Sequence, residues 1–304
     1  MHVSFHEGYR VDLPPTHPYP MGKYLLLRDV LAERGLIGPL RLVLPDEVPM
    51  AVLERVHTPE YLAQLQGDSL DPAQRRRLGI PFTPRLWRRS RLTVEGTRLA
   101  AAAALADGLA ANMAGGTHHA FADHGEGFCV INDVAVAVVD LIAARRIERA
   151  LIVDLDVHQG NGTAAIFAER PEVYTLSLHG ERNYPLVKPP STYDVGLADG
   201  TDDAQYLSAL QPALAAALLH APDLAFYVAG VDVAAGDRYG RLALTDAGVR
   251  ARDRQVIETL RDAGIPVVIV LGGGYAATTL RTAQLHALVF EEALRRWQQE
   301  RAEI

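Results

Sequence analysis

Three polar side chains spaced two residues apart carry the clearest chemistry in this sequence. Asp154, Asp156 and His158 lie in the run DLDVHQGNG. In an extended segment alternate residues project to one side, so the three side chains can face a common point. Carboxylate and imidazole groups together suit zinc or another first-row divalent metal. A helix cap would need only one carboxylate, so we interpret the run as a metal site.

Asp232 is a candidate ligand from another part of the chain. It follows an apolar run, where an aspartate is often only a turn residue, and Asp237 shortly after it competes for any role. Only the pairing with Asp156 and His158 favours Asp232. Two carboxylates and one imidazole leave room for a water and a substrate oxygen, which is typical of a catalytic site.

Two adjacent histidines, His118 and His119, follow Gly115 and Gly116. Neighbouring side chains point apart in a regular strand, so a shared site requires irregular backbone, which glycine permits. Beside a metal, such a pair can divide proton handling. One imidazole then takes a proton from water, and the other stays charged or oriented.

These residues must be positioned by strands and helices that alternate along the chain. Apolar runs predict strands at 150–153, 173–178, 224–231 and 265–271, and helical patterns occupy 162–169, 203–220, 245–263 and 278–297. Weaker patterns predict strands at 3–5 and 40–44, helical pieces at 24–34 and 62–65, and an alanine-rich helix interior at 99–114. Apolar strands separated by helices indicate a parallel sheet buried on both faces, whose ligands bind beyond the carboxyl ends of the strands.

The composition limits the function classes. The chain has 304 residues, 49% hydrophobic and 22% charged, with no composition shift, so we expect one α/β domain over residues 1–304. Its net charge of −7 argues against direct binding to nucleic acid. The single cysteine, Cys129, excludes a disulfide framework and a cysteine-rich zinc site. Without an apolar leader or an apolar run near ~18 residues, we expect a cytoplasmic protein that does not bind membranes.

An ordered set of motifs resembles the histone deacetylase family of the arginase–deacetylase fold. The motifs are GGTHHA, GEGFCVIND, DLDVHQGNG, SLH, AGVDVAAGDRYG and LGGGY, with HPYPMGKY and VHTPEYL nearer the amino terminus. They cover nearly the whole chain, and the compact bacterial and class IV-type members look most similar. The resemblance implies a single-domain, three-layer α/β/α fold with a mostly parallel central sheet.

The resemblance also implies two metal sites. One zinc ion per chain, with Fe²⁺ as the alternative, would be bound by Asp156, His158 and Asp232. A structural potassium ion would be bound by Asp154, Ser177 and Leu178.

The remaining roles concern catalysis and substrate binding. His119 would be the general base, His118 its partner held by Asp154, and Tyr275 a hydrogen-bond donor to the acyl oxygen. The substrate tunnel would be lined by Gly127, Phe128 and Tyr184, and the reacting groups would be supported from outside by Asp154, Asn161, Gly273 and Gly274.

Two positions depart from the family pattern. Gln159 stands where many members have a second histidine, which implies an adjustment of the metal site and not its loss. Asn161 stands where the family pattern has an aspartate behind the general base, although other members also have asparagine there. A neutral partner should leave the His119 imidazolium less stabilised.

The implied function is a zinc-dependent amidohydrolase that removes acetyl or another short acyl group from the side-chain amine of lysine in peptides or proteins. The alternatives are an acetylpolyamine or other small acylamide deacetylase and a non-catalytic acyl-lysine-binding protein. An arginase-type ureohydrolase would need D-x-H-x-D, whereas this chain has D-x-D-x-H. The sequence leaves the oligomeric state open. We interpret the arginines between Arg75 and Arg98 as solvated helix surface.

Overall fold

The central sheet is built from parallel strands alone. The computed structural model describes residues 1–303, and within them eight strands lie in the order β2-β1-β3-β8-β7-β4-β5-β6, each parallel to its neighbours. In chain order the strands are β1 (His2–Ser4), β2 (Arg41–Val43), β3 (Leu109–Asn112), β4 (Ala150–Asp154), β5 (Val173–Gly180), β6 (Tyr193–Leu197), β7 (Leu224–Val228) and β8 (Val267–Val270). The predicted parallel sheet is therefore confirmed.

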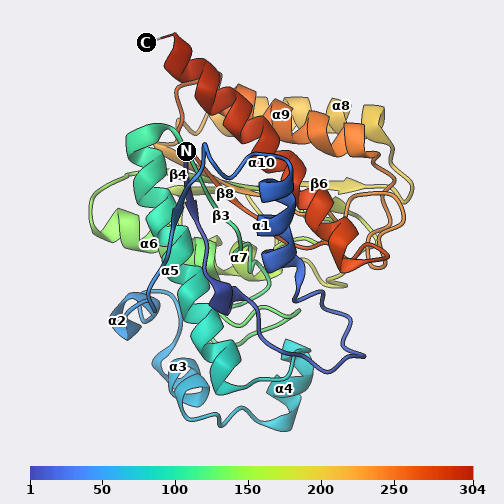
Figure 1. Ribbon diagram of the computed structural model, residues 1–304. Helices are drawn as coiled ribbons and strands as arrows, with labels where there is room; N and C mark the ends of the chain where they lie inside the picture. The colour runs from blue at the N-terminus through green and yellow to red at the C-terminus, as the bar shows by residue number, and fades with distance from the viewer. Residues whose placement is uncertain (304) are drawn as a thin grey trace.

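Helices cover both faces of the sheet (Figure 1). One face carries α5 (Pro84–Asp107), α6 (Asp133–Ala143) and α7 (Asn161–Phe167). The other face carries α1 (Lys23–Glu33), α8 (Asp203–Leu218), α9 (Asp246–Asp262) and α10 (Thr279–Ala302). The connections contain the short helices η1 (Glu7–Tyr9), α2 (Met50–Leu53), α3 (Pro59–Gln66) and α4 (Pro72–Leu78).

Alternate strand residues enter two separate hydrophobic clusters. In β4, Leu151 and Val153 pack with residues of α9 and α10, whereas Ile152 packs with residues of α5 and α6. In β8, Ile269 and Val270 divide in the same way. Because both faces of the sheet are covered, its strands are apolar at successive positions, which is why they appear in the sequence as continuous apolar runs.

The prediction of a helix through residues 99–114 is wrong at its carboxyl end. Helix α5 ends at Asp107, and Gly108 follows with a φ of +81°, which is favourable for glycine. The residues Leu109–Asn112 then form β3 between β1 and β8. Alanine favours helices in isolation, but here the small side chains are fully buried in the sheet, and tertiary packing overrides the local preference.

Other differences concern the ends of elements and the edges of the fold. The strand predicted at 224–231 ends at Val228, and the residues after it form the loop that carries Asp232. Strand β6 and helices α4 and α6 were not predicted. Strand β6 lies at the edge of the sheet and is largely exposed, so it lacks the apolar signal of the central strands.

The order of the strands changes direction between β4 and β7, which are neighbours in the sheet. The chain leaves β4 through α7 toward β5 on one side, and it leaves β7 through α9 toward β8 on the other side. Such a switch point opens a crevice at the carboxyl ends of the two strands, where α/β proteins bind ligands. The loops that follow β4 and β7 carry the predicted metal ligands.

Across residues 1–303 the structure contains no helix that combines the length and the apolar composition needed to cross a bilayer.

Candidate active site

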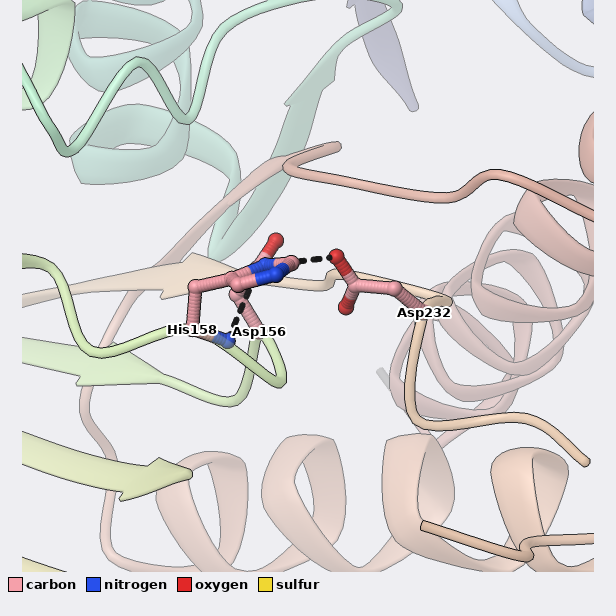
Figure 2. Close-up of side chains that lie close together, drawn as sticks. All are labelled: Asp156, His158 and Asp232. Carbon is pink, nitrogen blue, oxygen red and sulfur yellow. Dashed lines mark hydrogen bonds and ion pairs between the residues drawn. The ribbon is translucent and has the colours of Figure 1, made fainter. Parts of the chain in front are cut away.

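The three predicted zinc ligands converge at the switch point (Figure 2). Asp156 and His158 come from the loop after β4, and Asp232 comes from the loop after β7. His158 Nδ1 lies 3.0 Å from Asp156 Oδ1 and 3.2 Å from Asp232 Oδ2. One ligand atom from each residue lies within 4.8 Å of the other two. These atoms form a compact set of two oxygens and one nitrogen.

The loop after β4 is folded into turns and is not the extended segment that we expected. Asp154 Oδ1 accepts the backbone N–H of Asp156 at 3.2 Å, and Asp156 Oδ1 accepts that of His158 at 3.0 Å. Aspartate side chains commonly bind the backbone two residues on in this way. The turns direct Asp156 and His158 to the cluster with Asp232, whereas Asp154 turns toward His118. The run therefore does not present all three side chains to one point.

The cluster has the properties of a divalent-metal site. Zinc bound tetrahedrally at its usual distances would have ligand atoms about 3.3–3.6 Å apart, close to the distances of 3.0 Å and 3.2 Å from His158 Nδ1. Asp232 Oδ2 is buried, and apart from its 3.2 Å contact with His158 Nδ1 it has no polar partner that satisfies it among residues 1–303. Gly273 supplies the necessary space, because a Cβ there would lie 2.0 Å from Asp232 Oδ2.

The charges of the cluster also favour a cation. Burial raises the pKa of Asp232, and the negative charge of Asp156 raises it further. Burial alone would lower the pKa of His158, but hydrogen bonds to Asp156 and Asp232 outweigh burial and raise it. These directions favour a proton on the cluster when no cation is bound, and a divalent cation would displace that proton when it binds.

The two adjacent histidines face different partners. His118 Nδ1 lies 2.6 Å from Asp154 Oδ2, and His119 Nδ1 lies 2.6 Å from Asn161 Oδ1. Burial lowers the pKa of both rings, but the carboxylates of Asp154 and Asp156 raise that of His118 to about 9. The pKa of His119 stays well below its ordinary value, since the charges of His118 and His158 add to the effect of burial. The geometry therefore favours a charged His118 beside a neutral His119.

A cavity of about 350 Å³ reaches the cluster from the surface. It is lined by Arg77, Gly79, His119, Gly127, Phe128, His158, Tyr184, Tyr239 and Tyr275. All three predicted tunnel residues are among them. The backbone N–H groups of Gly127 and Phe128 donate to the carbonyls of Arg77 and Leu78, so α4 holds this loop in place. Gly127 has a φ of +54°, and a Cβ there would lie 2.7 Å from the His119 ring, which leaves room only for glycine.

Tyr275 lines the same cavity, and its backbone is held by a residue for which sequence reasoning found no role. Asp237 Oδ2 accepts the N–H of Tyr275 at 2.6 Å, and its other oxygen accepts those of Tyr239 and Gly240. The Tyr275 ring packs against Tyr239 with a centroid distance of 4.8 Å. Gly274, at a φ of +153°, immediately precedes Tyr275. The AGVDVAAGDRYG motif therefore contains one aspartate of the cluster, Asp232, and one that holds the backbone of Tyr275, Asp237.

The residues predicted to bind potassium lie at the carboxyl ends of β4 and β5. Asp154 and Ser177 are directly opposite each other in the parallel pair, and Leu178 follows in β5. Ser177 Oγ also lies 3.0 Å from His179 Nδ1. Gln159 turns away from the cluster, and its amide donates to Pro189 O and Asp194 Oδ1. Its departure from the family pattern therefore affects the neighbouring loop and not the ligand atoms.

A buried arginine that the sequence analysis missed joins the two ligand loops from behind. Arg252 of α9 is fully buried, and its Nη1 donates to Gly230 O at 2.6 Å and to Leu155 O at 3.3 Å. The adjacent Asp253 accepts from the other guanidinium nitrogens at 3.0 Å and 2.8 Å. Arg252 is spaced from Val249 and Val256 like the core-facing residues of a helix, and this pattern could have revealed its burial but not its contacts with the two loops.

Comparisons with known proteins agree with this geometry. Residues 17–289 match the histone deacetylase domain. The chain is 44% identical to an uncharacterized protein of Picosynechococcus over 96% of each chain, and 30% identical to histone deacetylase 2 of Arabidopsis thaliana over 89% of this chain and 73% of that protein. The crystal structure of the HD domain of HDA15 matches with a TM-score of 0.78 at 25% identity, covering 97% of this chain and 87% of that one. The expected arginase–deacetylase fold is thereby confirmed.

Replacing Arg252 with Met should lower the free energy of unfolding by about 3–5 kcal/mol, because the buried charge of Asp253 would lose its partner. Urea unfolding of the two proteins measures this difference. Arg254 provides a matched control on the same helix, since it is half-exposed and its buried partner Glu292 would keep its pairs with Arg250 and Arg295. Arg254→Met should change the stability by less than about 1 kcal/mol. Equal stabilities of the Arg252→Met variant and the wild type would contradict the role of Arg252.

Proposed function

The chain belongs to the histone deacetylase family, which implies a hydrolytic deacetylase, and from this premise we propose a zinc-dependent enzyme that removes acetyl or another short acyl group from the side-chain amine of lysine. One observation carries the proposal. At the switch point of the sheet, Asp156 and His158 of the cluster, His119 and Tyr275 line two cavities that share His119, His158 and Tyr275 in their walls. A metal cluster, a base and a hydrogen-bond donor are the groups that amide hydrolysis by water requires.

The metal would be held by Asp156, His158 and Asp232, with Fe²⁺ as the alternative to zinc. A zinc ion in such a site polarises the substrate carbonyl and lowers the pKa of water. The paired positions of Asp154 and Ser177 support a structural potassium ion bound by these residues and Leu178. The family resemblance suggests this second ion.

The protein side chains would divide the proton transfers. The low pKa of His119 favours its neutral form, which could take a proton from the attacking water and later give it to the leaving amine. His118 is paired with Asp154 and keeps its own proton, which adds a fixed positive charge beside the reacting centre. Tyr275 would donate a hydrogen bond to the acyl oxygen as negative charge develops there. Water adds to the carbonyl, the C–N bond breaks, and an acid and a free amine result.

The walls of the 350 Å³ cavity favour the methylene chain of a lysine as part of the substrate. Phe128 and Tyr184 contribute aromatic rings to the cavity wall, to which Gly127 adds no side chain. Aromatic walls suit an uncharged methylene chain whose polar amide lies at the inner end. Among residues 1–303, Arg77 is the one charged residue other than histidine that lines this cavity. Its positive charge would repel a cationic polyamine. We therefore favour acyl-lysine in a peptide or protein over an acetylpolyamine.

The direct test is release of acetate from a small acetyl-lysine substrate by a zinc-loaded preparation, with inhibition by a hydroxamate. A panel of acyl-lysine peptides of different acyl length and acetylated polyamines then identifies the substrate class. Binding of these peptides without release of acid would identify a non-catalytic acyl-lysine-binding protein and contradict the proposal.

Asp156→Ala should abolish retention of metal, because it removes one of three ligands and leaves too few for a stable site. Metal analysis of the purified proteins should give one zinc per chain for the wild type and almost none for the variant. Two metals per wild-type chain would instead indicate the binuclear site of a ureohydrolase.

Tyr275→Phe should lower turnover by roughly 10²–10³, the usual effect of losing one donor to a developing oxyanion. The metal content should stay at the wild-type value, since Tyr275 is not among the ligand atoms of the cluster. Steady-state kinetics and metal analysis of the same preparation check both points. Wild-type turnover would remove Tyr275 from the mechanism.

Arg77→Glu should shift substrate preference toward acetylated polyamines, because it reverses the charge at the cavity. We expect kcat/KM for a polyamine relative to a neutral acetyl-lysine peptide to rise about tenfold, which corresponds to about 1.4 kcal/mol of electrostatic discrimination. Arg76→Glu is the matched control, since it makes the same change in net charge on the same helix but does not line the cavity. Equal shifts in the two variants would exclude a specific role for Arg77.

A further inference from the structure

A carboxylate lies one hydrogen bond behind the neutral partner of the predicted base. Asn161, at the start of α7, accepts from His119 Nδ1 through its Oδ1 at 2.6 Å, and its Nδ2 donates to Glu126 Oε1 at 2.7 Å. Glu126 belongs to the loop that forms the cavity wall, and its side chain is 17% exposed. Asn161 is almost completely buried. His119, Asn161 and Glu126 therefore form a continuous hydrogen-bonded series.

Glu126 determines which way the Asn161 amide faces. An ionised carboxylate can only accept hydrogen bonds, whereas an amide has one accepting and one donating end. The contact of 2.7 Å with Glu126 therefore requires the NH₂ group of Asn161 on that side. The carbonyl oxygen must then face His119. Without an acceptor at this position, the two orientations of the amide would be much closer in energy.

The orientation of the amide in turn determines the tautomer of His119. A carbonyl oxygen 2.6 Å from Nδ1 can only accept, so Nδ1 must carry the hydrogen. Nε2 is then left with its lone pair available to take a proton. The reversed amide would present an NH₂ group to Nδ1 and move the hydrogen to Nε2, where the ring could not act as a base.

Glu126 is well suited to remain an acceptor. Burial alone would raise the pKa of its carboxyl group, but hydrogen bonds from His124, Tyr184 and Asn161 outweigh burial and lower it to about 2. The hydroxyl of Tyr184 donates to the same oxygen that accepts from Asn161. The carboxylate therefore stays ionised throughout the pH range in which a histidine base works.

We propose that Glu126 is a positioning residue that fixes the amide of Asn161 and through it the Nδ1–H tautomer of His119. The effect on catalysis rests on the proposed function, whereas the effect on the tautomer does not. We expected the neutral Asn161 to leave the His119 imidazolium less stabilised. The negative charge of Glu126, one hydrogen bond behind Asn161, compensates for this. The sequence motif GEGFC contains this residue, but nothing in its spacing connects it to Asn161.

The test compares Glu126→Gln with the wild type in the zinc-loaded enzyme. The ¹⁵N chemical shifts of the imidazoles report the tautomers directly, and a His119→Ala variant assigns the signal. We expect a single Nδ1–H tautomer in the wild type and a mixture in Glu126→Gln, since glutamine can present either end to Asn161. Turnover should fall by roughly 10–100-fold, part of the usual contribution of a general base.

A double substitution provides a reciprocal check. Asn161→Asp alone places a second carboxylate 2.7 Å from Glu126 and should also lose turnover. Combined with Glu126→Gln, the new aspartate accepts from both His119 and the glutamine amide. The double variant should therefore regain the Nδ1–H tautomer and at least tenfold of the lost turnover. If Glu126 merely stabilises its loop, a substitution of Asn161, which is distant in the sequence, is not expected to restore turnover.

Two control variants test whether the effects of Glu126→Gln are specific to its hydrogen bond with Asn161. Asp123→Asn removes an exposed carboxylate from the same loop and should leave turnover and the tautomer unchanged. Tyr184→Phe removes another of the hydrogen bonds to Glu126 and alters the cavity wall, so it should change KM and leave the tautomer intact. A tautomer that responds to Tyr184→Phe as strongly as to Glu126→Gln would overturn the proposal.

The decisive contrary result is a single Nδ1–H tautomer in Glu126→Gln together with wild-type turnover. A loss of turnover that Asn161→Asp does not rescue, with the tautomer unchanged, would equally overturn it. If the wild type releases no acetate but its tautomer still responds to Glu126→Gln, the proposed function fails and this inference stands.

Discussion

The structure depends on the burial of three aspartates at one edge of the sheet. Asp154, Asp156 and Asp232 are all nearly inaccessible to water, and an ionised carboxylate in such a place is strongly destabilising unless it is paired. The surrounding residues satisfy this requirement in different ways. His118 pairs with Asp154, His158 lies between the other two carboxylates, and backbone N–H groups supply further donors. A divalent cation fits the same electrostatic requirement.

The three aspartates lie close together because the loops that carry them start at the switch point of the sheet. The loops after β4 and β7 leave neighbouring strands toward opposite faces, so their first residues meet without competing for space. Arg252 then joins the two loops from behind through their carbonyl oxygens, and Asp253 balances its charge. The positions of Asp156, His158 and Asp232 therefore depend on the packing of α9 as well as on the two loops.

The same electrostatics shifts the pKa values of two adjacent histidines in opposite directions. His118 and His119 have identical chemistry and their rings lie only 4.1 Å apart, yet one is favoured as a cation and the other as a neutral base. The difference arises from what lies behind each ring. A carboxylate contacts His118 directly, whereas an amide separates His119 from the carboxylate of Glu126. A neutral group between base and carboxylate fixes the tautomer without placing full negative charge against the ring.

The sequence by itself determined the apolar strands, the parallel sheet and the motif residues. Continuous apolar runs and the chemistry of the side chains are local properties of the chain. It could not determine that residues 109–112 form a strand, since alanine prefers a helix until a sheet surrounds it. Nor could it show Arg252, Asp237 or Glu126 beside the site, because each acts on residues distant in the chain. Tertiary structure alone decided these contacts, since hydrogen bonds across the fold depend on which loops meet and not on any spacing along the sequence.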